Sequence, residues 1–270
     1  MIRIGELAFI GLGLCGCDYL SIKALRYLKN ADHIFLETYT SILPNFSREK
    51  LEKLLGKRII EIKRRDLEEK EGEDIIRLAT RKRVALITPG DPFIATTHNF
   101  LRLKALKMGI KVLTIFGVSV VSAAQSATGL HCYKFGRVCT LVIPEERYGY
   151  FPETPYIVLT QNLKYGLHTL FLLDLKIEEE KYLTPQEAID LLLKLEEKIK
   201  LKAISENTVA VVLARLGCNS QAVVCNTLKR LRKIDFGPPP YCLIIPGKLH
   251  PLEKESLILL AGAPPEIFED

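Results

Sequence analysis

The sequence predicts an α/β protein of two domains. Apolar segments of strand length alternate with amphipathic segments of helix length along the chain, which is the pattern of sheets covered by helices. The 270 residues are 48% hydrophobic and 26% charged, which is enough for two modest cores. Near Gly117 a strand gives way to a run of small residues and a loop through Gly129. We therefore expect a parallel-sheet-rich domain over 1–117 and a second α/β domain over 118–270.

The first domain begins with a βαβ unit. Residues 7–11 form an apolar run typical of a buried strand, and 33–37 form a second. Between them, 21–29 places Ala24, Leu25 and Leu28 on one face of a helix. The alternation continues with strands at 58–62, 84–88 and 111–116 and helices at 73–81 and 96–108. Such alternation predicts a mostly parallel sheet.

The second domain repeats the alternation without repeating the first sequence. Residues 118–124 read as the start of a small-residue helix. Strands are expected at 137–143, 168–174, 208–215, 222–226 and 241–245, with helices at 156–165 and after Thr184. The last helix has a capping signature, with Thr184 as N-cap, Pro185 at the first helical position and Glu187 placed to reach back.

Several classes of protein do not fit the composition. Charged or turn residues interrupt every apolar run well before the roughly 18 residues of a membrane span. The start of the chain imitates a secretory signal, but Glu6 borders its apolar run and no cleavage site follows cleanly, so we expect a buried strand and a cytoplasmic protein. The seven cysteines contain no CxxC pair, and of them only Cys132 adjoins a histidine, which argues against a zinc site. Cys139, Cys225 and Cys242 are expected as buried residues of strands.

The net charge of +6 permits an acidic partner without requiring one. The basic groups at 63–65, 81–83 and 229–233 alternate with acidic stretches and lack interleaved aromatic residues. We read them as solvated helix faces and expect no direct binding of nucleic acid.

The turn after the first strand matches a dinucleotide-binding pattern. Residues 11–16 read GLGLCG, a GxGxxG match, and Glu37 ends the next strand about twenty residues on. The third glycine of that fingerprint should open a helix, yet the first good helical stretch begins only at Ser21. A turn whose glycines let the backbone approach a ligand fits better than nicotinamide binding, which stays an alternative.

The segment TPGDPFIATTH at 88–98 carries the second candidate site. An apolar strand stops at two prolines flanking Gly90 and Asp91, and Thr96 or Thr97 can cap the following helix. Ligands of parallel sheets bind beyond the carboxyl ends of the strands, so Asp91 is placed to accept hydrogen bonds from a ligand. Equally, Asp91 can be a turn former that binds its own backbone.

Eight segments that follow one another in order over nearly the whole chain carry a family resemblance: IGLGL at 10–14, ETYTSIL at 37–43, TPGDPFIATTH at 88–98, GVSVVSA at 117–123, TGLHCYKFGR at 128–137, GLHTLFLLDLK at 166–176, VVLARLG at 211–217 and FGPPPYCLIIPGKLHPLE at 236–253. Through them the chain resembles the diphthine synthase family, within the wider tetrapyrrole-methylase-like class. The GLGL and GDP turns belong to the whole class, whereas YTSIL, TTH and YKFG point to this family.

The resemblance implies two α/β domains with mixed sheets, S-adenosylmethionine bent in the cleft between them, and a homodimer. The family's cofactor positions fall on Leu14, Asp91, Ile94, Ser119, Val120, Leu173, Leu216 and Tyr241. The last is a histidine in the family, so Tyr241 is a departure. Several of these positions are apolar, as expected where packing and backbone groups hold a ligand.

The implied activity is repeated methyl transfer to the aminocarboxypropyl group on a histidine of translation elongation factor 2. A sulfonium methyl group is already activated, so the enzyme mainly aligns the acceptor and excludes water. Asp91, Glu37, His98 and Tyr39 are candidates for the base, solvent is another, and none is singled out. His131, His168 and His250 resemble scaffold positions. The alternatives are a methylase acting on a tetrapyrrole and a dinucleotide-binding oxidoreductase. The sequence leaves open whether three methyl groups are added or a fourth as an ester.

Overall fold

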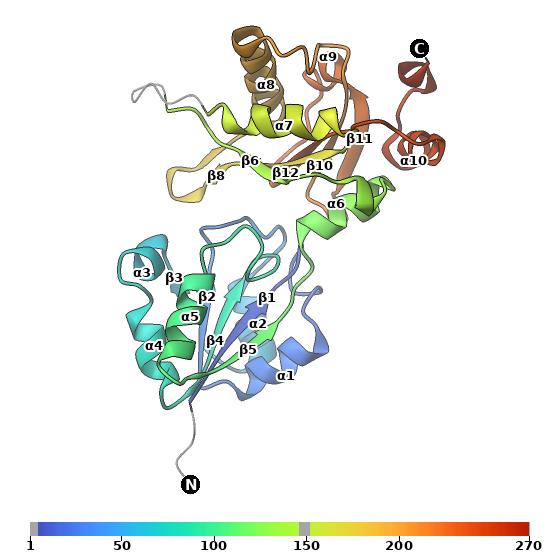
Figure 1. Cartoon of the computed structure of the whole chain (residues 1–270). Helices are drawn as coiled ribbons and strands as arrows, with labels where there is room; N and C mark the ends of the chain where they lie inside the picture. Colours follow the sequence, from blue (N-terminus) through green and yellow to red (C-terminus); the bar gives the residue numbers. More distant parts are fainter. Residues whose placement is uncertain (1–4, 146–151, 270) are drawn as a thin grey trace. The chain divides into compact units, whose positions relative to one another are not determined.

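The computed structural model describes residues 5–145 and 152–269 (Figure 1). The chain divides into two compact units, Met1–Val120 and Val121–Asp270. The division follows Val120, whereas the sequence pattern placed it at Gly117. The two are the N-terminal unit and the C-terminal unit.

The N-terminal unit contains one parallel sheet. Its strands are β1 (Glu6–Gly11), β2 (His33–Glu37), β3 (Ile60–Ile62), β4 (Arg83–Thr88) and β5 (Lys111–Ile115). They lie in the order β3-β2-β4-β1-β5, and every adjacent pair is parallel. The predicted parallel sheet is confirmed.

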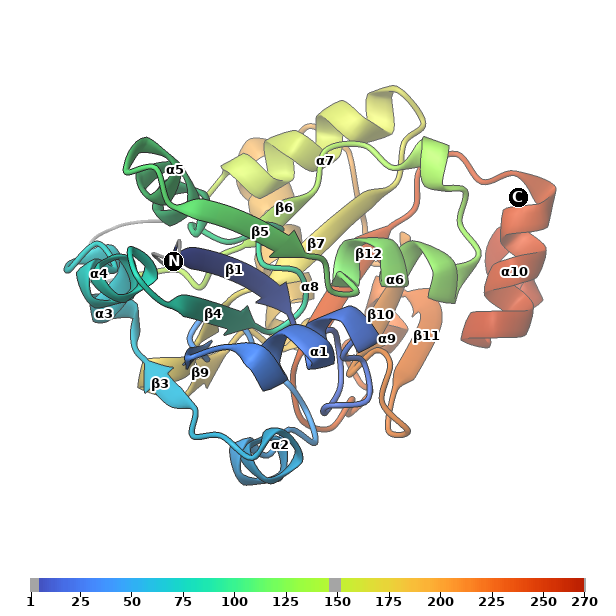
Figure 2. The same cartoon turned by 90° about the horizontal axis from the view of Figure 1, so that it is seen from below.

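Helices cover both faces of this sheet (Figure 2). One face holds α1 (Ile22–Asn30) and α2 (Arg48–Leu55), and the other holds α3 (Arg64–Glu68), α4 (Glu73–Ala79) and α5 (Asn99–Lys107). Successive residues of a strand point to opposite faces, so Ala8 and Ile10 pack with α1 and α2 while Leu7 and Phe9 pack on the other side. Burial on both faces explains why β1 is apolar without alternation.

Two helix starts in this unit differ from the sequence prediction. Helix α2 was not predicted, although Ser47 caps it by accepting from Lys50 N–H at 3.1 Å and Gly56 ends it in the left-handed conformation. Helix α5 follows His98, so the capping role expected of Thr96 or Thr97 is wrong. The Thr96 hydroxyl instead donates to the Pro92 carbonyl at 2.7 Å, which keeps it in the preceding loop.

The order of the strands creates a topological switch point between β1 and β4. These strands are neighbours, yet β1 continues into α1 on one face and β4 continues into α5 on the other. The chain therefore leaves the carboxyl ends of β1 and β4 toward opposite faces of the sheet. Ligands of open α/β sheets bind at such a switch point.

The C-terminal unit is built on a mixed sheet. Its strands are β6 (Cys139–Leu141), β7 (Thr169–Leu173), β10 (Val209–Ala214), β11 (Ala222–Thr227) and β12 (Tyr241–Ile245), in the order β11-β10-β12-β7-β6. Only the β6–β7 pair is parallel. A small hairpin, β8 (Leu175–Lys176) with β9 (Lys181–Tyr182), stands apart and was not predicted. Cys139, Cys225 and Cys242 lie in strands, as predicted. Cys225 and Cys242 are buried, but Cys139 is only half-buried, so its predicted burial is wrong.

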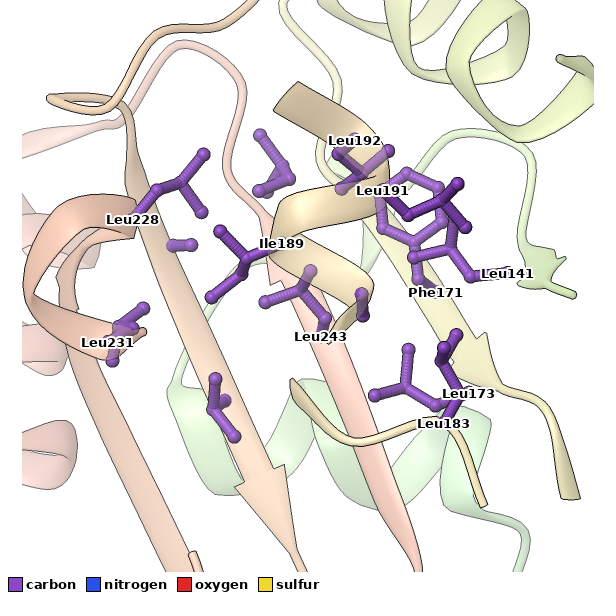
Figure 3. Packing of buried hydrophobic residues seen from close by; sticks show 14 of the residues in the cluster. Leu141, Phe171, Leu173, Leu183, Ile189, Leu191, Leu192, Leu228, Leu231 and Leu243 are labelled. Carbon is purple, nitrogen blue, oxygen red and sulfur yellow. The ribbon is translucent and has the colours of Figure 1, made fainter. Parts of the chain in front are cut away.

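The core of this unit lies beneath α7 (Thr154–Lys164), α8 (Pro185–Ile199) and α9 (Leu228–Leu231). In Figure 3, α8 directs Ile189, Leu191 and Leu192 toward the sheet, where Phe171 and Leu243 are also fully buried. The capping box predicted at Thr184 and Glu187 is confirmed. The unit also contains α6 (Val120–Thr128) and α10 (Pro251–Ala261), of which α10 was not predicted. Across 5–145 and 152–269, no helix has the length and apolarity to cross a membrane.

Candidate active site

The loops after β1 and β4 are joined by backbone hydrogen bonds at the switch point. Leu12 N–H donates to the Thr88 carbonyl at 2.8 Å, and Gly13 and Gly90 exchange N–H···O bonds of 3.1 and 2.8 Å. Helix α1 begins only at Ile22, so a long loop separates the glycines from the helix. A dinucleotide fingerprint needs its third glycine to open that helix, and this chain lacks the feature.

Three glycines bring the ends of β1, β4 and β5 into direct backbone contact. A Cβ on Gly11 would lie 2.4 Å from the Gly90 carbonyl oxygen, and one on Gly117 would lie 2.0 Å from the same atom. Both distances are far below van der Waals contact, and the obstructing atoms are backbone. Only glycine fits at Gly11 and Gly117, which holds the loops that follow the three strands close together.

Asp91 ties the β4 loop to the end of β5. Its Oδ1 accepts from Phe93 N–H at 3.0 Å and its Oδ2 accepts from Gly117 N–H at 3.3 Å. The side chain is buried, with the residue 8% exposed. The turn-forming role weighed from the sequence is therefore present. It does not exclude ligand binding, because each carboxylate oxygen has a further lone pair.

The other N-terminal positions expected to contact the cofactor lie on the loops that follow these strands or, for Val120, at the first residue of α6. Leu14 follows β1, Ile94 follows β4, and Ser119 and Val120 follow β5. Leu14, Ser119 and Val120 are half-buried, whereas Ile94 is 46% exposed. The structure thus brings five expected residues to the carboxyl edge of one sheet, where exposed apolar side chains are available to cover a ligand.

Among the described residues, Thr88 contributes a buried polar atom without a partner to this edge, as Tyr39 and His98 do. Thr88 ends β4 with no exposed surface, and its hydroxyl oxygen has no hydrogen bond to any residue within the described ranges. Buried hydroxyl groups are normally paired, so an orphan beside a strand-end loop fits a site that a polar ligand completes. Exposed apolar side chains beside an unpaired hydroxyl suit a ligand that is partly apolar and partly polar.

Glu37, Tyr39 and His98 lie at this edge but are buried. Glu37 and His98 have no exposed surface, and Tyr39 is 4% exposed. Burial lowers the pKa of His98, and burial raises the pKa of Glu37 despite hydrogen bonds from Thr40 and Tyr39. Side chains without accessible surface do not contact an acceptor directly, so neither Glu37 nor His98 suits the role of direct base.

The remaining expected positions gather at one edge of the C-terminal sheet. Leu173 ends β7, Leu216 follows β10 and Tyr241 begins β12. Because β12 is antiparallel to both neighbours, its start lies beside their ends: Tyr241 pairs with Ala214, and Cys242 pairs with Leu172. The three residues, spread over about a quarter of the sequence, are neighbours at that edge, each less than 9% exposed.

Arg215 holds the loop that leads to Tyr241. Its guanidinium donates to the carbonyls of Phe236, at 2.6 Å, and Pro238, while Tyr241 Oη donates to the Gly237 carbonyl. Burial raises the pKa of Tyr241, so it remains a neutral hydrogen-bonding group. Sequence reasoning missed Arg215, since its partners lie more than twenty residues away in the chain.

A second polar cluster surrounds Glu253 on α10. We define the Glu253 cluster as Glu253, His131, Lys134, His168 and His250. Glu253 accepts from His131 N–H at 2.9 Å, His250 N–H at 2.8 Å, His168 Nε2 at 2.9 Å and the Lys134 ammonium. Gly247 N–H donates to His168 Nδ1 at 3.0 Å, so His168 carries its proton on Nε2. The cluster joins the YKFG segment to α10, which gives the scaffold histidines a structural role. Within the described parts of the chain no group of His, Cys, Asp and Glu side chains is arranged to hold a metal ion.

Comparison with known proteins covers both units. Residues 6–232 match the family of Tetrapyrrole (Corrin/Porphyrin) Methylases. The diphthine synthase of Staphylothermus marinus is 43% identical over 265 residues, which are 97% of this chain and 96% of the relative. That of Methanocaldococcus jannaschii is 44% identical over 253 residues, 93% of this chain and 97% of the relative. A crystal structure of diphthine synthase superposes with a TM-score of 0.86 at 36% identity, covering 97% of this chain and 98% of that one.

This chain belongs to the diphthine synthase family. Members of the tetrapyrrole methylases use S-adenosylmethionine, and the chain is an S-adenosylmethionine-dependent methyltransferase of diphthamide biosynthesis. The family expected from the sequence is confirmed, and the oxidoreductase alternative is excluded.

Proposed function

We propose that this methyltransferase adds methyl groups repeatedly to the aminocarboxypropyl group on a histidine of translation elongation factor 2. The observation that carries the proposal is identity of 43–44% with diphthine synthases over nearly the full length of both chains. A tetrapyrrole acceptor is the alternative within the fold. The family-specific segments YTSIL and YKFG favour the protein acceptor. Since the translation factor acts on ribosomes, we place the reaction in the cytoplasm, and we expect a homodimer.

We further propose that the cofactor contacts Leu14, Asp91, Ile94, Ser119 and Val120 of the N-terminal unit and Leu173, Leu216 and Tyr241 of the C-terminal unit. The glycine contacts and the unpaired Thr88 hydroxyl support the first set. The shared sheet edge supports the second. In this proposal Asp91 accepts hydrogen bonds from the cofactor with its free lone pairs, and Tyr241 supplies a flat surface and a hydroxyl.

Little acid–base chemistry is required of the protein. The bound cofactor supplies an activated methyl group, and each transfer needs the acceptor nitrogen unprotonated and aligned with the methyl–sulfur bond. Glu37 and His98 have no exposed surface. We infer that water takes the proton released after each of the first two transfers to the nitrogen, and that the loops contribute alignment and exclusion of bulk solvent.

The test is methyl transfer from labelled S-adenosylmethionine to three acceptors. These are elongation factor 2 carrying the aminocarboxypropyl group, the same factor without it, and a tetrapyrrole. We expect label only in the first, and mass spectrometry of the histidine peptide would count the methyl groups. Label in the tetrapyrrole, or equal label in both forms of the factor, would contradict the proposal.

A further inference from the structure

Two fully buried titratable groups face each other at the carboxyl edge of the N-terminal sheet. Glu37 ends β2 and His98 caps α5, and neither side chain has exposed surface. Their facing atoms, Glu37 Oε2 and His98 Nε2, are 3.6 Å apart. That separation is too long for a formed hydrogen bond and short enough for one to form with a small shift.

The hydrogen bond of His98 to Pro92 fixes which ring nitrogen carries the proton. His98 Nδ1 lies 3.0 Å from the Pro92 carbonyl oxygen, which can only accept, so Nδ1 carries the proton. In the neutral ring Nε2 is then an acceptor. It has no hydrogen-bond partner among residues 5–145 and 152–269.

Glu37 is held just as firmly as an acceptor. Its Oε1 accepts from Tyr39 N–H at 2.6 Å and Thr40 N–H at 2.7 Å, and its Oε2 accepts from the Thr40 hydroxyl at 2.7 Å. If Glu37 is ionised and His98 is neutral, a carboxylate oxygen and a ring lone pair face each other. That arrangement is repulsive and leaves a buried charge without a cation.

The charged groups around the pair lie closer to solvent. They are Arg64 and Glu68 on α3, Glu61 on β3 and Arg102 on α5, all exposed except the half-buried Arg102. Arg64 stacks over the Tyr39 ring, 5.2 Å from its centroid, and Glu68 accepts from Thr97. Burial therefore dominates the pair, raising the pKa of Glu37 and lowering that of His98, and both directions favour neutral side chains.

We propose that Glu37 and His98 share one proton and together position the β4 loop that carries Asp91. With the proton between them, Oε2–H donates to Nε2, and both acceptors are satisfied without a net charge. Each residue acts through its neighbours as a positioning residue and does not touch the substrate. The effect on the cofactor rests on the proposed role of Asp91.

The connection from the pair to Asp91 is short. The Pro92 carbonyl, next to Asp91 in the chain, accepts from His98 Nδ1–H and from the Thr96 hydroxyl. The intervening Ala95 has φ of 56°, a left-handed conformation that is unfavourable for alanine and persists only when neighbours enforce it. When the pair loses its proton, repulsion pushes His98 away from Glu37 and weakens its hold on Pro92. The Pro92 carbonyl then loses one of the two hydrogen bonds that hold the loop.

The variant Glu37→Gln tests this inference. A glutamine amide donates to His98 Nε2 at every pH and can donate its second hydrogen to the Thr40 hydroxyl, so it imitates the protonated acid. Glu68→Gln is the matched control, since it removes a carboxylate near the same loop without touching His98. Two readouts apply: amide NMR shifts of Phe93 and Gly117, the donors to Asp91, and S-adenosylhomocysteine affinity from pH 5 to 9.

In the wild type, both amide shifts should follow one midpoint, shared by the His98 ring nitrogens and the Glu37 carboxyl carbon. Affinity should fall above that midpoint, by up to about tenfold per pH unit. Glu37→Gln should flatten both profiles and keep its affinity at low pH within about twofold of wild type, whereas Glu68→Gln should keep the wild-type profiles. Flat wild-type amide profiles, separate midpoints for Glu37 and His98, or an unchanged pH profile in Glu37→Gln would overturn the inference. The NMR arm needs no ligand, so failure of S-adenosylhomocysteine to bind would count against the proposed function alone.

Discussion

Neutralising Glu253 should destabilise the C-terminal unit in a pH-dependent way. The carboxylate has no exposed surface and accepts four hydrogen bonds, two from backbone N–H groups and two from side chains. In Glu253→Gln the amide nitrogen faces donors that it cannot accept from. Loss of one partner of a buried charged network typically costs about 3–5 kcal/mol, and we expect that loss at pH 7.

The pH dependence follows from the pKa of Glu253. Burial alone would raise it, but hydrogen bonds from His250, Lys134, His131 and His168 outweigh burial and lower the pKa from 4.5 to about 2. A depressed pKa stabilises the fold above 4.5, and this stabilisation disappears as pH falls toward 2. At about 1.36 kcal/mol per pKa unit, the full contribution is about 3 kcal/mol, of which roughly 1.4 kcal/mol is lost between pH 7 and 3.5.

The assay is urea unfolding followed by circular dichroism, since the chain contains no tryptophan for fluorescence. Wild type, Glu253→Gln and the control Glu255→Gln, which changes an exposed carboxylate on the same helix, are compared at pH 7 and 3.5. The stability difference between wild type and Glu253→Gln should shrink by about 1.4 kcal/mol at the lower pH. A difference that is the same at both pH values, as expected of Glu255→Gln, would refute the reasoning.

Three substitutions test the proposed site. Gly117→Ala places a methyl group 2.0 Å from a backbone oxygen and should cost about 1–3 kcal/mol of stability and weaken S-adenosylhomocysteine binding, whereas Gly109→Ala, with open space around it, should leave binding unchanged. Asp91→Ala should weaken binding by about 1.5–3 kcal/mol. Asp32→Ala, which removes a similar bond to Arg83 N–H at the opposite end of the sheet, should leave binding unchanged. If calorimetry gave Asp91→Ala the same affinity as wild type, Asp91 would have a turn-forming role alone. Tyr241→Ala should lose more than about tenfold in affinity and Tyr241→His less, and an alanine variant that binds like wild type would remove Tyr241 from the site.

Much of the N-terminal fold could be predicted because local and tertiary signals agree. Strands β1, β2 and β4 are buried on both faces and therefore have apolar centres, so the sequence predicts their positions within a residue or two. Helices α2 and α10 were missed although their caps, Ser47 with Gly56 and His250 with Gly262, stand in the sequence. The antiparallel pairing of β12 with both neighbours depends on contacts distant in sequence, and no local pattern specifies it.

The site could be predicted as loops but not as a network. Glycines and Asp91 at strand ends mark the loops of a parallel sheet, and these loops do meet at the switch point. Folding brings Gly11 and Gly117 close to the Gly90 carbonyl and places His98 opposite Glu37. Neither contact follows from a local sequence pattern. For the same reason, the sequence indicated only scaffold roles for the histidines around Glu253 and did not predict their hydrogen bonds to it.

The most direct test of the account is an experimental structure with S-adenosylhomocysteine bound. We predict ligand density at the carboxyl edge of the parallel sheet, within hydrogen-bonding or van der Waals contact of Leu14, Asp91, Ile94, Ser119 and Val120, with the Thr88 hydroxyl or a water bound to it completing the polar contacts. Ligand bound elsewhere, with the loops after β1 and β4 untouched, would contradict it.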